Sequence, residues 1–330
     1  MRPTTMQYVR LGNSGLKVSK IILGCMTYGT PAWQGWVLPE EEGIKHIKIA
    51  FVHSLSAIRN IDLSYYSYDA GINTFDTANF YSNGQSEITL GKAIKEHNLP
   101  RDEIVVMTKV FFTVGKEPGE LYIAPLDSEK AGYVNQHGLS RKHIFDSVKH
   151  SLERLQLDYI DVLQCHRFDP ETPVSETMQA LHDVVKAGYV RYIGMSSCYA
   201  WQYYAIQHNL TPFISMQNHH NLLYREEERE MFPTLKHFEV GSIPWSPLAR
   251  GHQTKRTETD PVEEIAKKRG ISMAQVAVAY SMGKEGISAP IVGTTSVANL
   301  KDLIGAIEVT LTEEEVRYLE EPYKPLPIIH

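Results

Sequence analysis

The chain has 330 residues, of which 42% are hydrophobic and 22% are charged, as in an ordinary globular protein able to bury a large core. Its formal net charge of -6 excludes the basic field that binding to nucleic acid or to an anionic membrane surface requires. We therefore expect a small-molecule partner, with no nucleic-acid partner and no membrane association.

Cysteine usage and the first residues of the chain indicate the compartment. The three cysteines, Cys25, Cys165 and Cys198, are too few and too scattered for a disulfide framework or a zinc site with CxxC spacing. The start, MRPTTMQYVRLG, lacks the apolar segment of a signal peptide, and no apolar run is long enough to cross a bilayer. We expect a cytoplasmic protein with free thiols and no metal.

Short apolar runs that alternate with amphipathic stretches predict the secondary structure. Residues 7–24 predict a β-hairpin around the turn formers Asn13, Ser14 and Gly15. Eight apolar runs predict strands at 21–26, 74–78, 104–110, 159–166, 192–197, 214–218, 241–245 and 289–293. Three- and four-residue spacing of apolar side chains predicts helices at 87–97, 141–156, 174–186, 200–209 and 273–284.

This alternation predicts the fold class. Most of the apolar runs are nearly continuous, as in parallel strands that are buried on both faces. Strands that alternate with helices favour an α/β fold, a closed (β/α)8 TIM barrel after the N-terminal hairpin, as one domain over residues 1–330. No GxGxxG motif opens a helix, so the Rossmann fingerprint is missing. Residues 115–138 predict a long loop, and residues 51–68 have weak periodicity.

Four side chains near the carboxyl ends of three predicted strands are the candidate catalytic residues. The active site of a barrel lies at this end of its strands, where the sequence places Asp76, Tyr81, Lys109 and His166. A buried lysine requires a carboxylate partner, and Asp76 is suitable. A cation near Tyr81 favours the phenolate and lowers the phenol pKa, while a neutral imidazole can orient a carbonyl oxygen.

Each of these residues also has a purely structural interpretation. The lysine and aspartate can form a structural salt bridge, the tyrosine can pack in a loop, and the histidine can be a hydrogen-bonded core residue. Together, however, they form a coherent acid site for reducing a carbonyl. No GxSxG elbow, HExxH motif or carboxylate cluster is present, so hydrolysis is the weaker interpretation.

Several motifs resemble those of the aldo-keto reductases, in the order that this family has. They are INTFDTANFYSNGQSEITLGKAI, VVMTKV, LDYIDVLQCH, GYVRYIGMSS, SMQNHHNLLYR and WSPLARG, and the resemblance extends from about Tyr8 to Pro325. The segments ILGCMTYG and EEPYKP resemble the fungal aryl-alcohol-dehydrogenase-like branch, which includes reductases of secondary metabolism.

The resemblance implies an NADPH-dependent carbonyl reductase. Tyr81 would protonate the carbonyl oxygen as hydride arrives, Lys109 held by Asp76 would depress the Tyr81 pKa, and His166 would orient the carbonyl. Ser196, Ser197 and Gln217 match positions that contact the nicotinamide carboxamide, and Trp245 matches an aromatic residue that stacks on its ring. The pyrophosphate and adenosine positions match Ser246, Leu248, Arg250, Gly251, Gly293, Thr294, Thr295, Asn299 and Asp302.

The sequence departs from the family pattern in three places. Residues 51–68 intervene before the second strand, as an insertion or a translated intron. The segment after Gly251 is shorter than usual, which weakens the expected clasp on the cofactor. Neither Thr294 nor Asn299 is basic, although some family members hold the 2'-phosphate there, so NADH is not excluded.

Two further questions follow from the resemblance. A nucleotide-binding protein with weak or regulatory activity is the alternative function, and a misassembled, non-folding gene product is a third. The aromatic residues that follow early strands could line a pocket for an aromatic substrate or simply pack the loops. These residues are Tyr28, Trp33, Trp36, Phe111 and Phe112.

Overall fold

The computed structural model describes residues 6–51, 70–196, 201–249, 251 and 260–327. The chain forms two compact units. Unit 1 comprises Met1–Leu23, Ile49–Asn73 and Gln217–His330, and unit 2 comprises Gly24–Lys48 and Thr74–Met216. Each unit therefore combines segments that are distant in the sequence. The single barrel domain expected over residues 1–330 stays a prediction.

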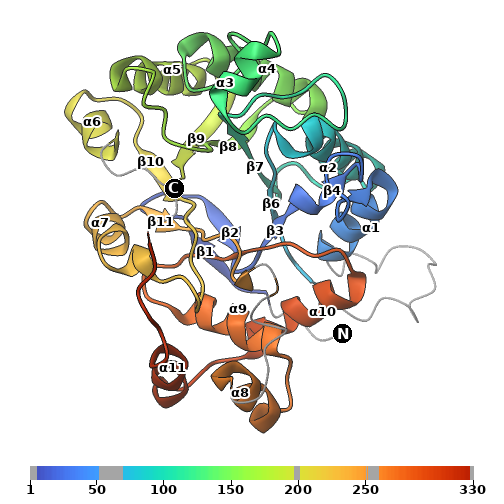
Figure 1. Cartoon of the computed structure of the whole chain (residues 1–330), viewed down its shortest axis with the longest axis vertical. Helices are drawn as coiled ribbons and strands as arrows, with labels where there is room; N and C mark the ends of the chain where they lie inside the picture. The colour runs from blue at the N-terminus through green and yellow to red at the C-terminus, as the bar shows by residue number, and fades with distance from the viewer. Residues whose placement is uncertain (1–5, 52–69, 197–200, 250, 252–259, 328–330) are drawn as a thin grey trace. The chain divides into compact units, whose positions relative to one another are not determined.

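Unit 2 contains a parallel sheet whose strands alternate with helices along the chain (Figure 1). Strands β6 to β10 follow one another in the sheet in chain order, and each pairs in parallel with the next. These strands are β6 (Thr74–Asp76), β7 (Val105–Val110), β8 (Ile160–Cys165), β9 (Val190–Met195) and β10 (Phe213–Met216). Two further short strands, β4 (Tyr28–Gly29) and β5 (Leu38–Pro39), pair in parallel with each other. The helices are α1 (Glu40–Phe51), which runs on into unit 1, α2 (Gln85–Glu96), α3 (Pro125–Lys130), α4 (Arg141–Leu155), α5 (Val174–Lys186) and α6 (Trp201–Gln207).

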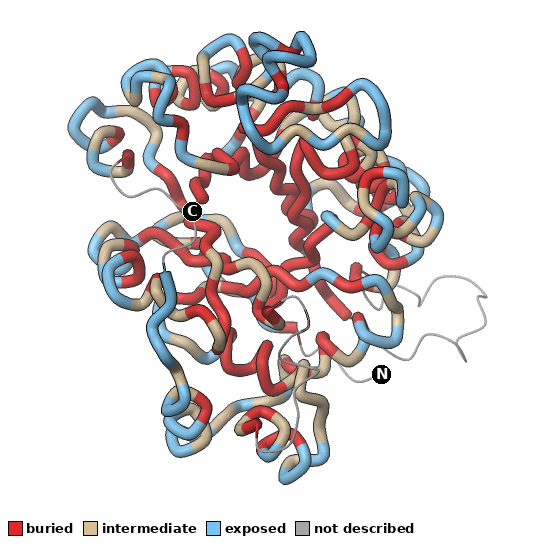
Figure 2. The backbone as a smooth tube through the Cα atoms, in the orientation of Figure 1, coloured by how far each residue is buried: buried red, intermediate tan, exposed pale blue. Residues whose placement is uncertain are grey.

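The central strands of this sheet are buried along their whole length. Every residue of β7 and β8 is buried, which agrees with their nearly continuous apolar sequences (Figure 2). Helix α4 packs on β7, and α5 packs on β9 and on α4. The Ser140 hydroxyl accepts a hydrogen bond from the His143 amide and caps the start of α4. Gln156 ends the helix with a φ of 57°.

Unit 1 begins with the predicted hairpin. Strand β1 (Tyr8–Arg10) pairs antiparallel with β2 (Lys17–Ser19), and β3 (Ile22–Gly24) pairs in parallel with β12 (Ile291–Val292). Helices α8, α9 and α11 share an apolar core that includes Ile265, Tyr280 and Leu319. The remaining elements are β11 (Gly241–Ser242), α7 (Met231–His237), α8 (Pro261–Arg269), α9 (Met273–Gly283), α10 (Val297–Gly305) and α11 (Glu313–Glu320).

Most predicted elements lie where the sequence placed them, with local differences. The strand expected at 241–245 is only β11, because Pro244 lacks an amide donor, and the chain continues with an isolated bridge at Trp245. The loop expected over 115–138 is wrong at α3, whose six residues are too few for a periodic signal and begin at a favourable Pro125. Apart from Phe51 at the end of α1, the segment 51–68 lies outside the described residues.

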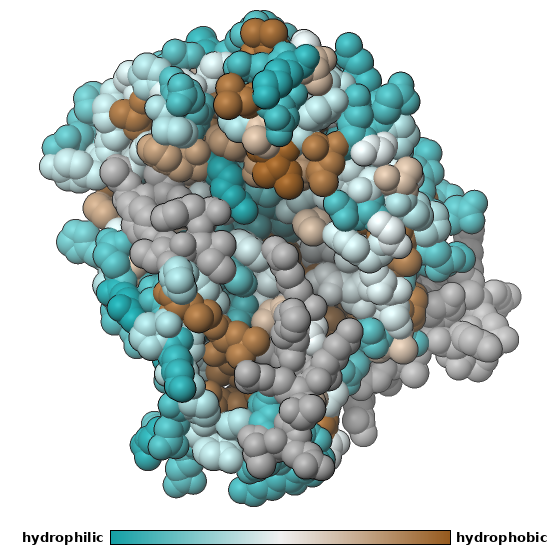
Figure 3. All heavy atoms as spheres, in the orientation of Figure 1, coloured by the Kyte–Doolittle hydropathy of each residue, from teal (hydrophilic) through white to brown (hydrophobic). Residues whose placement is uncertain are grey.

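The segment around α3 also exposes apolar side chains. Figure 3 shows apolar surface over and beside α3. The exposed fractions in this segment reach 60% for Ile123, 67% for Leu126 and 66% for Val134. Isolated exposed apolar side chains are normal on a protein surface.

Candidate active site

The parallel sheet of unit 2 brings three of the four predicted catalytic residues to one edge. Asp76 is the last residue of β6, Lys109 lies near the end of β7, and His166 directly follows β8. In the register of the sheet, Asp76 lies opposite Met107, and Lys109 lies opposite Gln164. The carboxyl ends of these strands therefore meet at one edge, which is where barrel enzymes carry their active sites.

Asp76, Lys109 and Tyr81 form one hydrogen-bonded cluster. Lys109 Nζ donates to Asp76 Oδ2 at 2.6 Å, to the Thr77 carbonyl at 2.8 Å and to the Tyr81 hydroxyl at 3.2 Å. Gln164 Nε2 donates to the other carboxylate oxygen of Asp76 at 2.8 Å. The lysine side chain is fully buried, so its charge depends on these oxygens for stabilisation. The predicted pairing of lysine with aspartate is present in the structure.

The electrostatics of the cluster differ in one respect from the sequence expectation. Burial lowers the pKa of Lys109, but Asp76 and Tyr81 together outweigh this effect, and the pKa lies above its ordinary value. Burial raises the pKa of Tyr81 more than the Lys109 charge lowers it. The predicted lowering effect of Lys109 on the Tyr81 pKa is therefore present, but desolvation of the phenolate, which the sequence argument did not include, is larger and raises the pKa above its ordinary value. Tyr81 is a neutral phenol beside an ammonium.

His166 completes the group as a neutral imidazole. Its ring centroid lies 5.6 Å from that of Tyr81, at an interplanar angle of 84°. Burial holds the pKa of His166 well below its ordinary value, and the nearby charges of Lys109 and Arg167 act in the same direction. Its Nδ1 atom is buried without a hydrogen-bond partner among the described residues. A neutral ring can give a hydrogen bond to a carbonyl oxygen, as the sequence predicted.

A left-handed turn holds Tyr81 in place. Ser82, Asn83 and Gly84 all have positive φ, at 49°, 50° and 89°. Such backbone is costly for residues other than glycine, so surrounding contacts must maintain it. Asn83 supplies them, since its Oδ1 accepts from the Gly115 amide at 2.9 Å and its Nδ2 donates to the Glu120 carbonyl at 2.8 Å. Asn83 was not among the predicted site residues, and only the SNG turn sequence could have drawn attention to it.

Aromatic rings surround Tyr81 and His166 on the side of the loops. The Trp33 ring lies 5.4 Å from Phe80 and 6.5 Å from Tyr81. The Phe112 ring lies 4.9 Å from Phe80 and 5.1 Å from His166. We call Trp33, Phe80 and Phe112 the aromatic wall. Trp33 and Phe112 were predicted from the sequence, whereas Phe80 was missed because it lies inside the motif that contains Tyr81.

Two more of the five predicted aromatic residues, Phe111 and Tyr28, have different surroundings. Phe111 contacts Phe112 at 5.1 Å and His137 at 4.7 Å, so it supports the aromatic wall. Tyr28 is fully buried and its ring meets His46 at 5.5 Å. Among the described ring contacts, none joins Tyr28 to Tyr81. Contact of Tyr28 with a substrate stays a prediction.

The residues predicted to bind the nucleotide lie in both units. In unit 2, Ser196 is buried at the end of β9, and its amide donates to the Cys165 carbonyl at 3.0 Å. Ser197 and Arg250 lie outside the described residues. In unit 1, Gln217 is buried, and Trp245 stacks on His219 with a centroid distance of 4.1 Å and an interplanar angle of 7°.

Further predicted nucleotide residues of unit 1 lie in two turns and in helix α10. Ser246 and Gly251 have positive φ, at 55° and 84°, and Leu248 lies between them. Thr294 precedes α10, whose cap residue Ser296 accepts from the Asn299 amide. Asp302 Oδ2 accepts from Ser272 Oγ at 2.6 Å, so this carboxylate also joins α10 to the start of α9. Gly293 and Thr295 are exposed in the same turn as Thr294.

Two features, a membrane-spanning helix and a metal-binding group of side chains, are absent from the described part of the chain. Its helices include none long and apolar enough to pass through a membrane. Its His, Cys, Asp and Glu side chains form no group of three or more that could hold a metal ion. Cys25 and Cys165 are buried, and Cys198 lies outside the described residues.

Comparison with known proteins identifies the class that this fold and site define. The model of the Aldo/keto reductase family matches residues 20–324. The chain is 45% identical to versiconal hemiacetal acetate reductase of Aspergillus parasiticus, over 98% of each chain. It is 47% identical to a Schizosaccharomyces pombe protein with the provisional name aryl-alcohol dehydrogenase, over 97% of each chain. A solved thermostable aldo-keto reductase, in complex with the inhibitor epalrestat, has a TM-score of 0.74 and 27% identity, covering 96% of this chain and 99% of the other.

The chain belongs to the aldo/keto reductase family. The predicted resemblance to this family and to its fungal aryl-alcohol-dehydrogenase-like branch is confirmed. The predicted (β/α)8 fold class is also confirmed, by the family match and the likeness to the solved reductase. The protein is accordingly an oxidoreductase of carbonyl compounds, a class that generally uses nicotinamide cofactors and small-molecule substrates.

Proposed function

We propose that this protein reduces an aromatic aldehyde or ketone to the corresponding alcohol with NADPH, and that Tyr81 is the general acid. The observation that carries the proposal is the contact of the Tyr81 hydroxyl with Lys109 Nζ, which is itself fixed by Asp76. A neutral phenol beside a buried ammonium can release a proton and leave a phenolate that the ammonium stabilises. The raised pKa of Tyr81 keeps the proton on the phenol until negative charge develops on the substrate oxygen.

Each residue of the cluster has a distinct task in this reaction. The bound nicotinamide would supply hydride to the carbonyl carbon. Tyr81 gives its proton to the carbonyl oxygen, and His166 hydrogen-bonds the same oxygen as a neutral donor. Lys109 stabilises the tyrosinate that remains, and Asp76 fixes the position and charge of Lys109. Preorganised donors at the point where charge develops are the largest contribution that a protein usually makes to such a step.

The residues predicted to hold the cofactor fit a nicotinamide dinucleotide chemically. In unit 1, Gln217 offers an amide for the carboxamide. The Trp245 indole already stacks on the His219 ring. We propose that it also stacks on the nicotinamide ring. The α10 N-terminus suits an anionic group. NADPH rather than NADH rests on the family resemblance, because Thr294 and Asn299 carry no charge.

The aromatic wall supports the substrate class. Trp33, Phe80 and Phe112 are each less than one tenth exposed. The Trp33 ring lies beside Tyr81, the Phe112 ring lies beside His166, and the Phe80 ring contacts both Trp33 and Phe112. Flat apolar side chains beside the reacting groups favour a planar aromatic substrate. The names of the relatives agree, since they refer to aryl alcohols and to a versiconal ester. We extend the proposal to a role in secondary metabolism and to a cytoplasmic location.

A steady-state assay tests the proposal. Oxidation of NADPH is followed with aromatic and aliphatic aldehydes, and the same panel is repeated with NADH. We expect turnover with NADPH and aromatic aldehydes. Quenching of NADPH fluorescence on binding, with no NADPH consumption on any aldehyde, would instead support the alternative of a nucleotide-binding protein without turnover. A lack of both binding and turnover would reject the proposal.

A further inference from the structure

Arg167 is a partly buried cation beside the proposed reacting groups. It directly follows His166, and its Nη1 donates to the His166 carbonyl at 2.7 Å. The same atom lies 3.5 Å from Ser196 Oγ, and the guanidinium carbon lies 6.0 Å from the centroid of Phe112. Its charge acts on both Tyr81 and His166. The guanidinium therefore lies near Phe112 of the aromatic wall and next to His166.

Arg167 differs from the other partly buried arginines of the described chain. Arg101, Arg154, Arg225 and Arg269 each form an ion pair with a carboxylate, at N–O distances between 2.5 and 2.8 Å. Among the described residues, no carboxylate lies within ion-pair distance of Arg167. Burial lowers the pKa of its guanidinium, with no carboxylate to oppose the effect. A guanidinium has five N–H donors, and the described residues provide acceptors for Nη1 alone.

Two side chains in or beside the aromatic wall also have polar atoms without a partner among the described residues. Trp33 Nε1 and His137 Nε2 are buried with no hydrogen-bond partner among the described residues. Trp33 belongs to the aromatic wall, and the His137 ring lies 6.3 Å from that of Phe112. Burial lowers the pKa of His137, so its ring is neutral near pH 7. Buried polar groups normally have partners, so these atoms indicate a polar ligand against an otherwise apolar wall.

We propose that Arg167 determines specificity by binding an acidic oxygen, a carboxylate or an ionised phenol, on an aromatic substrate that lies against Phe112. The inference rests on the proposed reduction and specifies its substrate class. A planar guanidinium matches a carboxylate through paired hydrogen bonds, which are stronger than those between neutral groups. The carbonyl to be reduced would point towards Tyr81 and His166, and the acidic oxygen towards Arg167.

The test compares acidic and neutral substrates in one assay. We measure kcat/KM of the wild type and of Arg167→Met for 3- and 4-carboxybenzaldehyde and for their methyl esters. The wild type should prefer the acids, and the ratio of acid to ester should fall about tenfold or more in the variant. Arg167→Lys should keep part of the preference, because a charge remains without the paired hydrogen bonds. Arg191→Met is the control, since Arg191 lies exposed over Tyr159 and should not affect the ratio.

Other outcomes overturn the proposal. A wild type that does not distinguish acid from ester, or an equal loss on both in Arg167→Met, would show that the arginine does not recognise the acidic group. A rise in the KM for NADPH that is the same with every substrate would assign Arg167 to the cofactor instead.

A second measurement does not depend on turnover or on the folding of a variant. Benzoate should bind to the wild type, measured by calorimetry, and methyl benzoate should bind at least tenfold more weakly if paired charge recognition operates. If no aldehyde is reduced but benzoate still binds selectively, the proposed reaction fails while the acidic subsite stands. Equal binding of both compounds would reject the subsite even in an active reductase.

Discussion

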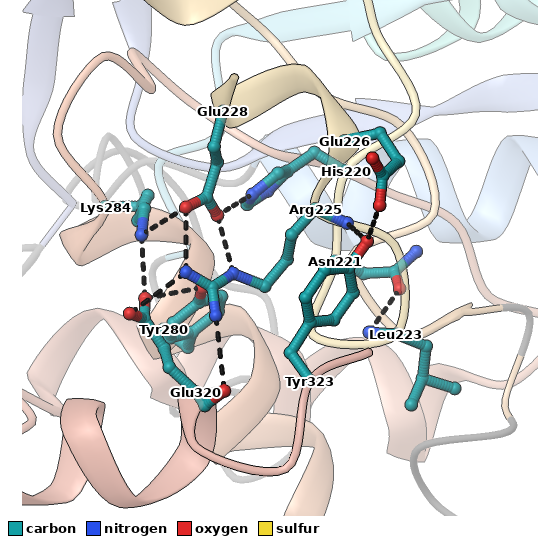
Figure 4. A network of polar contacts seen from close by, with 10 residues as sticks. All are labelled: His220, Asn221, Leu223, Arg225, Glu226, Glu228, Tyr280, Lys284, Glu320 and Tyr323. Carbon is teal, nitrogen blue, oxygen red and sulfur yellow. Dashed lines mark hydrogen bonds and ion pairs between the residues drawn. The ribbon is translucent and has the colours of Figure 1, made fainter. Parts of the chain in front are cut away.

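Two ionic clusters, a buried one in unit 2 and a partly buried one in unit 1, use the same kinds of residue in different ways. The cluster of unit 2 consists of Asp76, Lys109 and Tyr81. The cluster of unit 1, shown in Figure 4 and called the C-terminal network below, is centred on Glu228 and Glu320. Its other members are His220, Arg225, Tyr280 and Lys284. Both clusters pair carboxylates with cations and include a tyrosine.

In the C-terminal network every charge has several partners. Glu228 accepts hydrogen bonds from His220 Nε2, from Arg225 Nε and Nη2, and from Lys284 Nζ, each at 2.8 Å. Burial alone would raise the pKa of Glu228, but these donors hold it well below its ordinary value. Glu320 accepts from Tyr280 at 2.9 Å and from Lys284 at 2.7 Å. The network joins α9, α11 and the chain after Tyr224, which is a structural task.

The unit 2 cluster instead leaves one group available for chemistry. Lys109 binds three oxygens, of which two belong to Asp76 and the Thr77 carbonyl. The third is the Tyr81 hydroxyl, whose own hydrogen has no acceptor among the described residues. In the C-terminal network, the Tyr280 hydroxyl gives its hydrogen to Glu320. The Tyr81 hydroxyl accepts from Lys109, whereas the Tyr280 hydroxyl donates to Glu320. We propose that this difference separates an acid catalyst from a structural contact.

The matched tyrosine variants should give the largest difference between the two clusters. We expect Tyr81→Phe to lower kcat/KM for the aldehyde by about 10²–10⁴, the usual contribution of a general acid. Tyr280→Phe removes a hydroxyl of the same kind and should leave kcat/KM nearly unchanged. Steady-state kinetics measures both, and nucleotide binding to Tyr81→Phe confirms that this variant is folded. Equal kinetics for the two variants would remove the distinction between the clusters.

The matched lysine variants should differ in stability. Lys109→Met leaves the buried Asp76 without a cation, and breaking a buried pair in this way typically costs about 3–5 kcal/mol. Lys284→Met should cost less, because Arg225 still pairs with both Glu228 and Glu320. Urea unfolding of the two variants beside the wild type measures the free energies. A larger loss for Lys284→Met would show that the C-terminal network, and not the unit 2 cluster, depends on one cation.

Sequence patterns predicted the strand ends and the pairing of Lys109 with Asp76 well, because both depend on local order and on the cost of burying a lone charge. Continuous apolar runs located β7 and β8, and each run led directly to Lys109 or His166. The lowering effect of Lys109 on the Tyr81 pKa was also predicted. The larger, opposite effect of burial was not, because it depends on how much water the folded chain removes from the phenol.

Residues brought together from distant parts of the chain could not be predicted in the same way. Asn83 stabilises the turn at Tyr81 through the backbone of residues 115 and 120, and no periodic signal records such a contact. The C-terminal network joins Arg225 to Glu320, which lies 95 residues further along the chain. Arg167 drew no attention because an arginine is ordinary at a surface, and it is unusual only because no carboxylate of the described residues pairs with it.

The smallest expected effect concerns Glu227, the neighbour of Glu228 in the sequence. Its carboxylate is buried and accepts from Asn218 Nδ2 at 2.5 Å, with no cation beside it among the described residues. Burial raises its pKa from 4.5 to about 7, although the Asn218 hydrogen bond acts in the opposite direction. The contrast with Glu228 shows what one or more cations add to a buried carboxylate.

Glu227→Gln should therefore stabilise the protein above neutral pH. The unfolded chain releases the Glu227 proton near pH 4.5 and the folded chain near pH 7, so the folded state loses stability as the pH rises between these values. Since one pKa unit corresponds to about 1.4 kcal/mol, we expect a gain of about 1–3 kcal/mol at pH 8 and almost none at pH 4.5. Thermal unfolding at both pH values measures the effect. A gain that is independent of pH would mean that Glu227 is not the titrating group, and a loss at pH 8 would mean that its charge is stabilised by a partner.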